Sequence, residues 1–124
     1  MPITPVAIEQ GVSAIIGNSF SSLSQVNWTE KLFNNLGKTV ILEKESQIDA
    51  VTAISGSGPA YIFNFAETVI EIGKELGLSE QISKKIVLQT IVGAGLLANN
   101  SDKSPSKLRE NVTSPNGTTE AALN

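Results

Sequence analysis

Residues 59–98 read PAYIFNFAETVIEIGKELGLSEQISKKIVLQTIVGAGLLA. In the first half of this stretch, apolar side chains recur at the spacing of one helix face: Ile62, Phe65, Ala66, Val69, Ile72 and Leu76. Pro59 suits the first position of such a helix, and Gly77 suits the residue after its end. Ser79 is a preferred N-cap for a second helix, which we predict over residues 80–98. These two helices predict a mainly α fold.

The second predicted helix has little polar face beyond residue 86. Its apolar residues there are Ile86, Val87, Leu88, Ile91, Val92, Leu96 and Leu97. A helix that is apolar nearly all round is usually buried. Gly93 and Gly95 each cost about 1 kcal/mol of helix propensity relative to alanine, so we expect another backbone to approach closely there. Packing inside one domain and packing across a dimer both explain this pattern.

The N-terminal part of the chain has the pattern of an α/β protein. A β-tolerant run covers residues 11–17, and a Ser- and Asn-rich connection covers 18–25. Apolar spacing predicts a helix over 26–36, with Gly37 at its C-terminal end. A β-rich run at 39–42 follows. Strand, helix and strand in this order form the edge of an α/β sheet and not a complete sheet.

Composition limits the chemistry that the chain can perform. The 124 residues contain no cysteine and no histidine, which excludes disulfides, thiolate catalysis, Ser-His-Asp triads and metal sites built on those ligands. Hydroxyls, carboxylates, Lys, Arg, backbone dipoles or a cofactor must supply any chemistry. No pair of carboxylates has an evident catalytic or metal-binding spacing, so we expect no metal.

Charge and hydropathy exclude two classes of partner. The formal net charge is −3, from 9 basic and 12 acidic residues, and the basic residues do not cluster as in a nucleic-acid footprint. No apolar run reaches the roughly 18 residues of a membrane span. The N-terminus lacks the pattern of a secretory signal. We therefore expect a soluble, cytoplasmic protein that binds neither nucleic acid nor a membrane.

A first candidate site follows a short helix predicted from residue 48 to residue 54. Residues 55–61 read SGSGPAY, and the two glycines expose backbone N–H groups before the helix that Pro59 opens. Such N–H groups suit an anion or a close backbone contact. Tyr61 stands where a dinucleotide fingerprint requires glycine. On the pattern alone, a tight helix–helix turn is the favoured interpretation.

A second candidate site lies near the C-terminus, after a short helix that Ser104 and Pro105 are expected to begin. Residues 112–120 read VTSPNGTTE, with four hydroxyls around a Pro-Asn-Gly turn. A helix is predicted next, with Thr118 or Thr119 as its N-cap. A carboxylate docks well beside free N–H groups and hydroxyls at a helix start. Capping alone also explains the threonines.

Two long motifs resemble one known family. Residues 49–61, DAVTAISGSGPAY, resemble the opening of the helical domain of pyrroline-5-carboxylate reductase. Residues 108–119, LRENVTSPNGTT, resemble that family's substrate loop, and residues 1–5, MPITP, resemble a loop near the end of its nucleotide-binding domain. Because the motifs are long, correctly ordered and suitably separated, the resemblance is specific and spans the whole chain.

The resemblance implies a fold and a division into domains. Residues 1–46 would be the strand-helix-strand end of a Rossmann α/β domain, and residues 47–124 a helical dimerisation and substrate-binding domain. No segment resembles the family's glycine-rich phosphate turn. We therefore expect a fragment that lacks the N-terminal cofactor domain and the terminal helix. The family assembles as a homodimer or a higher homo-oligomer, in which one subunit's Rossmann domain and its partner's helical domain share an active site.

The resemblance also implies a reaction and residue roles. The family reduces 1-pyrroline-5-carboxylate to L-proline with NADPH or NADH, and the cofactor would be bound mainly by the missing domain. Asn111 would border the nicotinamide, and Thr119 would lie near the ring nitrogen as the catalytic residue. The implied substrate-binding residues are Val112, Ser114, Gly117, Thr118 and Thr119. The isolated chain is expected to be inactive.

Three positions depart from the family pattern. Asn116 replaces a usual glycine, but asparagine tolerates a left-handed backbone better than most residues. Glu120 replaces a usual apolar residue, and either repels a carboxylate or stabilises the helix start through its dipole. Ile3 replaces a usual asparagine. Two other functions stay open: a non-catalytic helical dimerisation module that has lost its cofactor domain, and an isolated binder of small carboxylates.

Overall fold

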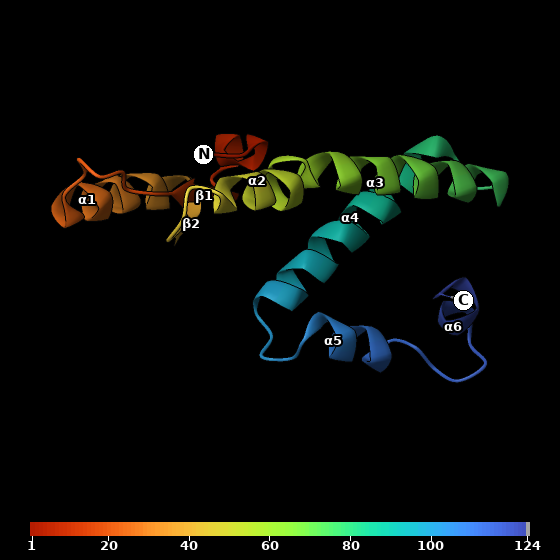
Figure 1. The fold of residues 1–124 in the computed structure, drawn as a ribbon. Coiled ribbons are helices and arrows are strands. Elements are labelled where there is room, and N and C mark those ends of the chain that lie inside the picture. The colour runs from red at the N-terminus through yellow and green to blue at the C-terminus, as the bar shows by residue number, and fades with distance from the viewer. Residues whose placement is uncertain (124) are drawn as a thin grey trace. The chain divides into compact units, whose positions relative to one another are not determined.

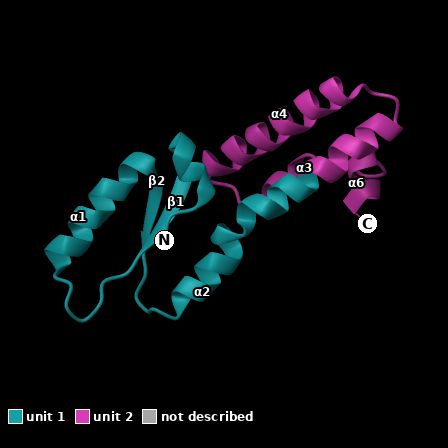
Figure 2. Ribbon diagram, turned by 90° about the horizontal axis from the view of Figure 1, so that it is seen from above, with its two compact units in different colours: residues 1–65 teal, residues 66–124 magenta. Residues whose placement is uncertain are grey.

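The structure is a computed structural model that describes residues 1–123 of the chain (Figure 1). Its contacts divide into two compact units, Met1–Phe65 and Ala66–Asn124 (Figure 2). The division falls inside a long helix and so differs from the boundary at 46/47 that we expect between domains. A unit defined by contacts need not coincide with a domain, so the domain boundary at 46/47 stays a prediction.

A small parallel sheet lies at the centre of the first unit. Strand β1 (Gly11–Ile15) pairs with β2 (Gly37–Ile41), and Gly11 lies opposite Gly37 at the start of the register. Helix α1 (Leu23–Phe33) connects them, as a parallel pair requires. The predicted strand-helix-strand order is confirmed as one β-α-β unit. A 3₁₀ helix, Thr4–Ile8, precedes β1.

Helix α1 begins three residues earlier than the sequence pattern predicts. Ser22 is its N-cap, and the Ser22 hydroxyl accepts a hydrogen bond from the Gln25 backbone N–H at 3.3 Å. The Gln25 side chain in turn accepts from the Ser22 N–H at 2.8 Å, which completes a capping box. A 3₁₀ turn, Asn34–Leu36, ends the helix.

Gly37 ends this turn with φ +134°, a conformation that side chains with a Cβ rarely adopt. A Cβ at this position would also collide with the backbone of Gly11. Gly37 therefore lets the two strands start side by side, whereas a Cβ on Gly11 would collide with Val6 of the 3₁₀ helix.

The predicted helix–helix turn at residues 55–58 is wrong in detail. Helix α2 (Gln47–Val51) continues as a π-helical segment, Thr52–Gly56, and α3 (Gly58–Glu75) follows after one bend at Ser57. Neither Gly56 nor Gly58 has a positive φ, so the glycines do not reverse the chain. The Ser57 N–H donates to the Thr52 carbonyl at 3.0 Å, and the Tyr61 hydroxyl donates to the Ala53 carbonyl at 3.2 Å.

The hairpin between α3 and α4 agrees with its prediction. Gly77 has φ +92°, and the Leu78 N–H donates to the Gly73 carbonyl at 3.0 Å, which closes α3. Ser79 is the N-cap of α4 (Glu80–Asn99), and its hydroxyl accepts from the Ile82 N–H at 3.3 Å.

Most of the apolar surface of α4 stays exposed in the single chain. In this helix only Ser83 and Val87 are buried. By contrast, Leu97 is 59% exposed, and residues 86–101 contain no charged side chain. The sequence left two explanations for this apolar helix, packing inside one domain and packing across a dimer. Packing inside the described part of the chain covers only a small part of the helix surface.

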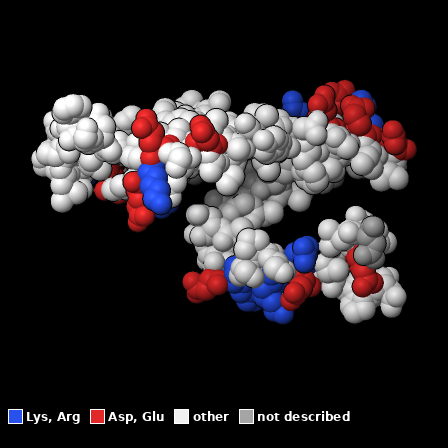
Figure 3. Space-filling model, viewed as in Figure 1, with Lys and Arg blue, Asp and Glu red and all other residues white. Residues whose placement is uncertain are grey.

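Two short helices complete the second unit. Helix α5 (Pro105–Asn111) begins at the predicted N-cap Ser104, whose hydroxyl accepts from the Lys107 N–H at 3.2 Å. Helix α6 (Thr118–Leu123) follows. Charged side chains gather over α5 and over the C-terminal part of α3 (Figure 3). In α3, the Glu71 carboxylate accepts a hydrogen bond from Lys74 and raises the pKa of that ammonium group.

Candidate functional site

All the residues implied at the site lie in one continuous segment from the end of α5 to the start of α6. Asn111 is the last residue of α5 and Val112 is its C-cap, with 65% of its surface exposed. Thr118 and Thr119 are the first two residues of α6. The structure thus places the implied site on a loop that two helix ends hold in place.

A tight turn forms the middle of this loop. The Gly117 N–H donates to the Ser114 carbonyl at 3.0 Å, with Pro115 as the second residue of the turn. Asn116 has φ +59°, the left-handed conformation that its usual glycine counterpart would adopt freely. Asparagine therefore preserves the turn, as expected.

Gly117 has no positive φ, and what a side chain at this position would meet is its neighbour Ser114. A Cβ at Gly117 would lie 2.5 Å from the Ser114 hydroxyl oxygen and 3.0 Å from the Ser114 carbonyl oxygen. A glycine at this position lets the Ser114 side chain lie directly against the start of α6.

The predicted N-cap is wrong, because neither Thr118 nor Thr119 occupies that position. Gly117 is the residue before α6, and the Ala121 N–H donates to its carbonyl at 3.2 Å. The carboxylate of Glu120 instead reaches back and accepts a 2.6 Å hydrogen bond from the Asn116 N–H. Glu120 thus bonds the turn that precedes α6, and both threonine hydroxyls are left for another partner.

Glu120 is the residue whose role sequence reasoning missed. The signal was present, because Glu120 stands three residues after Gly117, the spacing of the acidic member of a capping box. The sequence alone predicts for Glu120 either repulsion of a carboxylate or a stabilising dipole effect at the helix start. The hydrogen bond to Asn116 shows a third contribution, which is to fix the turn.

The Thr113 side chain holds the part of the loop that follows α5. The Thr113 hydroxyl donates to the Arg109 carbonyl at 2.7 Å, and the Thr113 N–H donates to the Glu110 carbonyl at 3.1 Å. A pocket of about 320 Å³ lies here, lined by Arg109, Thr113, Glu120 and Leu123. It brings one positive and one negative side chain together beside the loop.

The loop can bind a small anion through neutral donors. Ser114, Thr118 and Thr119 are exposed, and among residues 1–123 no hydrogen bond occupies their hydroxyl groups. The first N–H groups of any helix also lack partners within the helix. Several short donors without a buried counter-charge suit a carboxylate better than a metal cation. Within the described residues no group of three or more acidic side chains is placed to hold a metal ion.

The first unit has two connections from a strand to a helix, the place where an α/β fold usually holds the phosphates of a nicotinamide cofactor. Neither connection from a strand to a helix, residues 16–22 or residues 42–46, carries a repeated-glycine turn for phosphates; Gly17 is the single glycine. Asn111, at the C-terminal end of α5, remains the residue implied to border the nicotinamide. The described residues therefore do not fit the phosphates of the cofactor at either connection.

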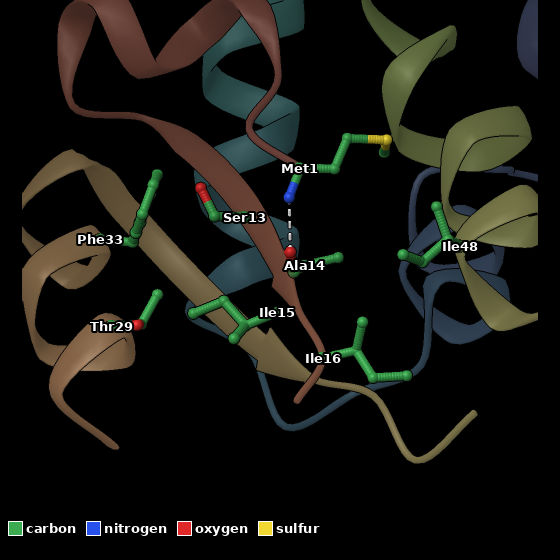
Figure 4. Close-up of a pocket in the computed structure, with 8 residues that line it drawn as sticks. All are labelled: Met1, Ser13, Ala14, Ile15, Ile16, Thr29, Phe33 and Ile48. Atoms are coloured by element: carbon green, nitrogen blue, oxygen red, sulfur yellow. Dashed lines mark hydrogen bonds between the residues drawn. The ribbon is translucent and has the colours of Figure 1, made fainter. Parts of the chain in front are cut away.

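Two further cavities lie in the first unit. One, of about 240 Å³, lies among β1, α1 and α2, where the Met1 amino group donates to the Ala14 carbonyl at 2.6 Å (Figure 4). The other, of about 530 Å³, is mainly apolar and includes Ser55, Gly58 and Tyr61 from the SGSGPAY motif. Neither brings together the hydroxyls of the C-terminal loop. Within residues 1–123, no helix is both long and apolar enough to cross a bilayer.

The fold is a set of helices preceded by a β-α-β unit, with a hydroxyl-rich loop between α5 and α6. Residues 45–124 match the family model described as pyrroline-5-carboxylate reductase dimerisation. The chain therefore belongs to the pyrroline-5-carboxylate reductase family, and the resemblance drawn from the two motifs is confirmed.

Individual relatives agree with this family. The chain is 45% identical over 123 residues to the pyrroline-5-carboxylate reductase of Pseudomonas aeruginosa, a match that covers 99% of this chain and 45% of the relative. It is 37% identical to pyrroline-5-carboxylate reductase 2 of Bacillus subtilis, with 99% and 44% covered. The chain thus spans a little under half the length of these curated relatives.

Solved structures confirm the fold. A pyrroline-5-carboxylate reductase from Coxiella burnetii superposes with a TM-score of 0.95 at 36% identity, covering 99% of this chain and 46% of that one. A pyrroline carboxylate reductase from Plasmodium falciparum, solved with NADP bound, gives a TM-score of 0.90 at 36% identity, covering 99% and 50%. The mainly helical fold with its short parallel sheet is therefore the fold of the matching part of these reductases.

Proposed function

We propose that this chain supplies the substrate-binding and dimerisation half of a pyrroline-5-carboxylate reductase, which reduces 1-pyrroline-5-carboxylate to L-proline. The observation that carries the proposal is the Ser114–Gly117 turn at the start of α6, in a chain whose residues 45–124 match the family model. Ser114, Gly117 and Thr118 would hold the substrate carboxylate, and Val112 would border the substrate ring.

A nicotinamide cofactor, NADPH or NADH, supplies the hydride in this reaction when it is bound. The residues of this chain bind and orient the imine so that its carbon is presented to the cofactor. The Thr119 hydroxyl, exposed at the second position of α6, would lie beside the ring nitrogen and donate a hydrogen bond there. Asn111 would border the nicotinamide from the end of α5.

A second copy of the chain would cover the apolar surface of α4. Ile86, Val92 and Leu96 are each more than half exposed. No atom lies within 4 Å of a Cβ built on Gly93 or on Gly95, so close approach of another backbone is possible there. A homodimer through this helix agrees with the family description, which names dimerisation.

The test is to join this chain to the cofactor-binding domain of the Pseudomonas aeruginosa relative and measure cofactor oxidation that depends on 1-pyrroline-5-carboxylate. We expect turnover by the fusion and none by the isolated 124-residue chain. The matched control carries the relative's own C-terminal half. If that control is active and the fusion with this chain is not, the non-catalytic dimerisation module is the correct alternative.

A further inference from the structure

The shortest hydrogen bond in the candidate site joins two positions that both depart from the family pattern. The Asn116 backbone N–H donates to the Glu120 carboxylate at 2.6 Å. Hydrogen bonds to an ionised acceptor are shorter and stronger than those between neutral groups. Glu120 is half-buried, whereas both partners of the charged pair Lys107–Glu110 on α5 have side chains that are more than half exposed.

The turn needs this support more than a turn with glycine would. Asn116 has φ +59°, which is less favourable for any residue with a Cβ than for glycine. The same turn also holds the Ser114 hydroxyl against Gly117, where no extra atom fits. A local shift of Asn116 would therefore move the Ser114 side chain away from the start of α6.

We propose that Glu120 is a positioning residue, whose carboxylate holds the Ser114–Gly117 turn in the conformation that binds the substrate carboxylate. The identity of the ligand rests on the proposed function; the role of Glu120 in fixing the turn does not. Glu120 acts through Asn116 and does not itself contact the substrate. Arg109 lines the pocket of about 320 Å³ that Glu120 also lines, and it has no ion pair among residues 1–123. Its positive charge offsets the negative charge of Glu120 beside an anionic ligand.

Amide hydrogen exchange, measured by NMR on the complete 124-residue chain, tests the contact directly. In Glu120→Leu, the Asn116 N–H should exchange about tenfold faster, as expected for the loss of one hydrogen bond to a charged group. Glu120→Gln keeps an acceptor oxygen and should retain most of the protection. The Thr113 N–H, bonded to the Glu110 carbonyl, should not change in either variant.

Glu110→Gln is the matched control, because it removes an equal charge from α5 without touching the turn. Equal Asn116 exchange in the wild type and Glu120→Leu would overturn the proposal, as would an equal acceleration in Glu110→Gln. Where Glu120→Leu does not fold, Glu120→Asp replaces it, since the shorter side chain falls short of Asn116.

Kinetics in the fusion enzyme test the consequence for the substrate. Glu120→Leu should raise KM for 1-pyrroline-5-carboxylate about three- to tenfold with kcat unchanged, because a positioned anchor contributes equally in ground and transition states. Glu120→Gln should restore most of the affinity. A lower KM in Glu120→Leu would show that the carboxylate repels the substrate and would overturn the positioning role. A wild-type fusion without any turnover contradicts the proposed function, while the exchange rates still decide the role of Glu120.

Discussion

The Ser83 hydroxyl oxygen of α4 lies 2.6 Å from the point that a Cβ on Gly73 of α3 would occupy. Ser83 is 1% exposed, and its hydroxyl has no hydrogen-bond partner among the described residues. A glycine in one helix thus faces a small side chain in the next, and this contact sets how closely the two helices of the hairpin approach.

This contact predicts opposite effects for two substitutions. Gly73→Ala should destabilise the chain by about 1–3 kcal/mol, because the added methyl has no room beside Ser83. Ser83→Ala should be neutral or stabilising, since it removes a buried polar group that has no partner. Urea unfolding at one fixed protein concentration measures both.

The double variant is the internal control for this contact. In Ser83→Ala the hydroxyl oxygen that faces Gly73 is gone. Gly73→Ala should therefore lower the free energy of unfolding less in the Ser83→Ala background than in the wild type. Additive effects would show that the two residues do not interact and that the hairpin is spaced by other contacts.

Loss of the Ser114 hydroxyl and loss of the Thr119 hydroxyl should affect different steady-state constants of the fusion enzyme. Thr119→Ala should lower kcat more than it raises KM, by about 100-fold or less, since a neutral hydroxyl is a weak acid. Ser114→Ala should mainly raise KM, because an anchor for the carboxylate contributes in ground and transition states alike. Thr119→Ser keeps the hydroxyl and should keep most of the activity. If Thr119→Ala alters only the melting temperature, Thr119 has a structural role and the catalytic assignment is wrong.

Gly117→Ala should raise KM without a comparable loss of stability. The new methyl would lie 2.5 Å from the Ser114 hydroxyl oxygen, so the Ser114 side chain must move away from the start of α6. The loop is at the surface, so we expect a change in free energy of unfolding of about 1 kcal/mol, at the low end for overpacking. Gly58→Ala is the matched control, because no atom lies within 4 Å of its Cβ position. An unchanged KM in Gly117→Ala would place substrate binding elsewhere.

Gly95→Leu should weaken self-association at least about tenfold, which corresponds to about 1.4 kcal/mol. A Cβ at Gly95 has open space in the single chain, so the substitution should not disturb the monomer fold. Sedimentation of the wild type, Gly95→Leu and Gln81→Leu measures the effect; Gln81 lies in the first turn of α4, outside the uncharged stretch. A wild-type chain that stays monomeric at high micromolar concentration would contradict the proposed dimer.

Features that depend on a few neighbouring residues were predictable from the sequence. Ser79 and Ser104 cap the predicted helices, and Gly77 ends α3 with a positive φ. Capping is decided by side chains within three or four residues of the helix end, so the local sequence contains the required information.

Three other features did not follow from the sequence pattern, and for the third only the tertiary structure decided the outcome. The glycines of the SGSGPAY motif allow either a turn or continued helix, and the hydrogen bond from Tyr61 to the Ala53 carbonyl accompanies the π-helical outcome. Thr118 and Thr119 could each have capped α6, but the helix begins at Thr118 after Gly117, and the Glu120 carboxylate bonds the preceding turn. The apolar pattern of α4 predicts that its surface is covered by another part of a protein. Only the fold shows which part of the α4 surface remains exposed in the single chain. Burial depends on contacts between residues far apart in the chain, and the periodicity of one helix does not contain that information.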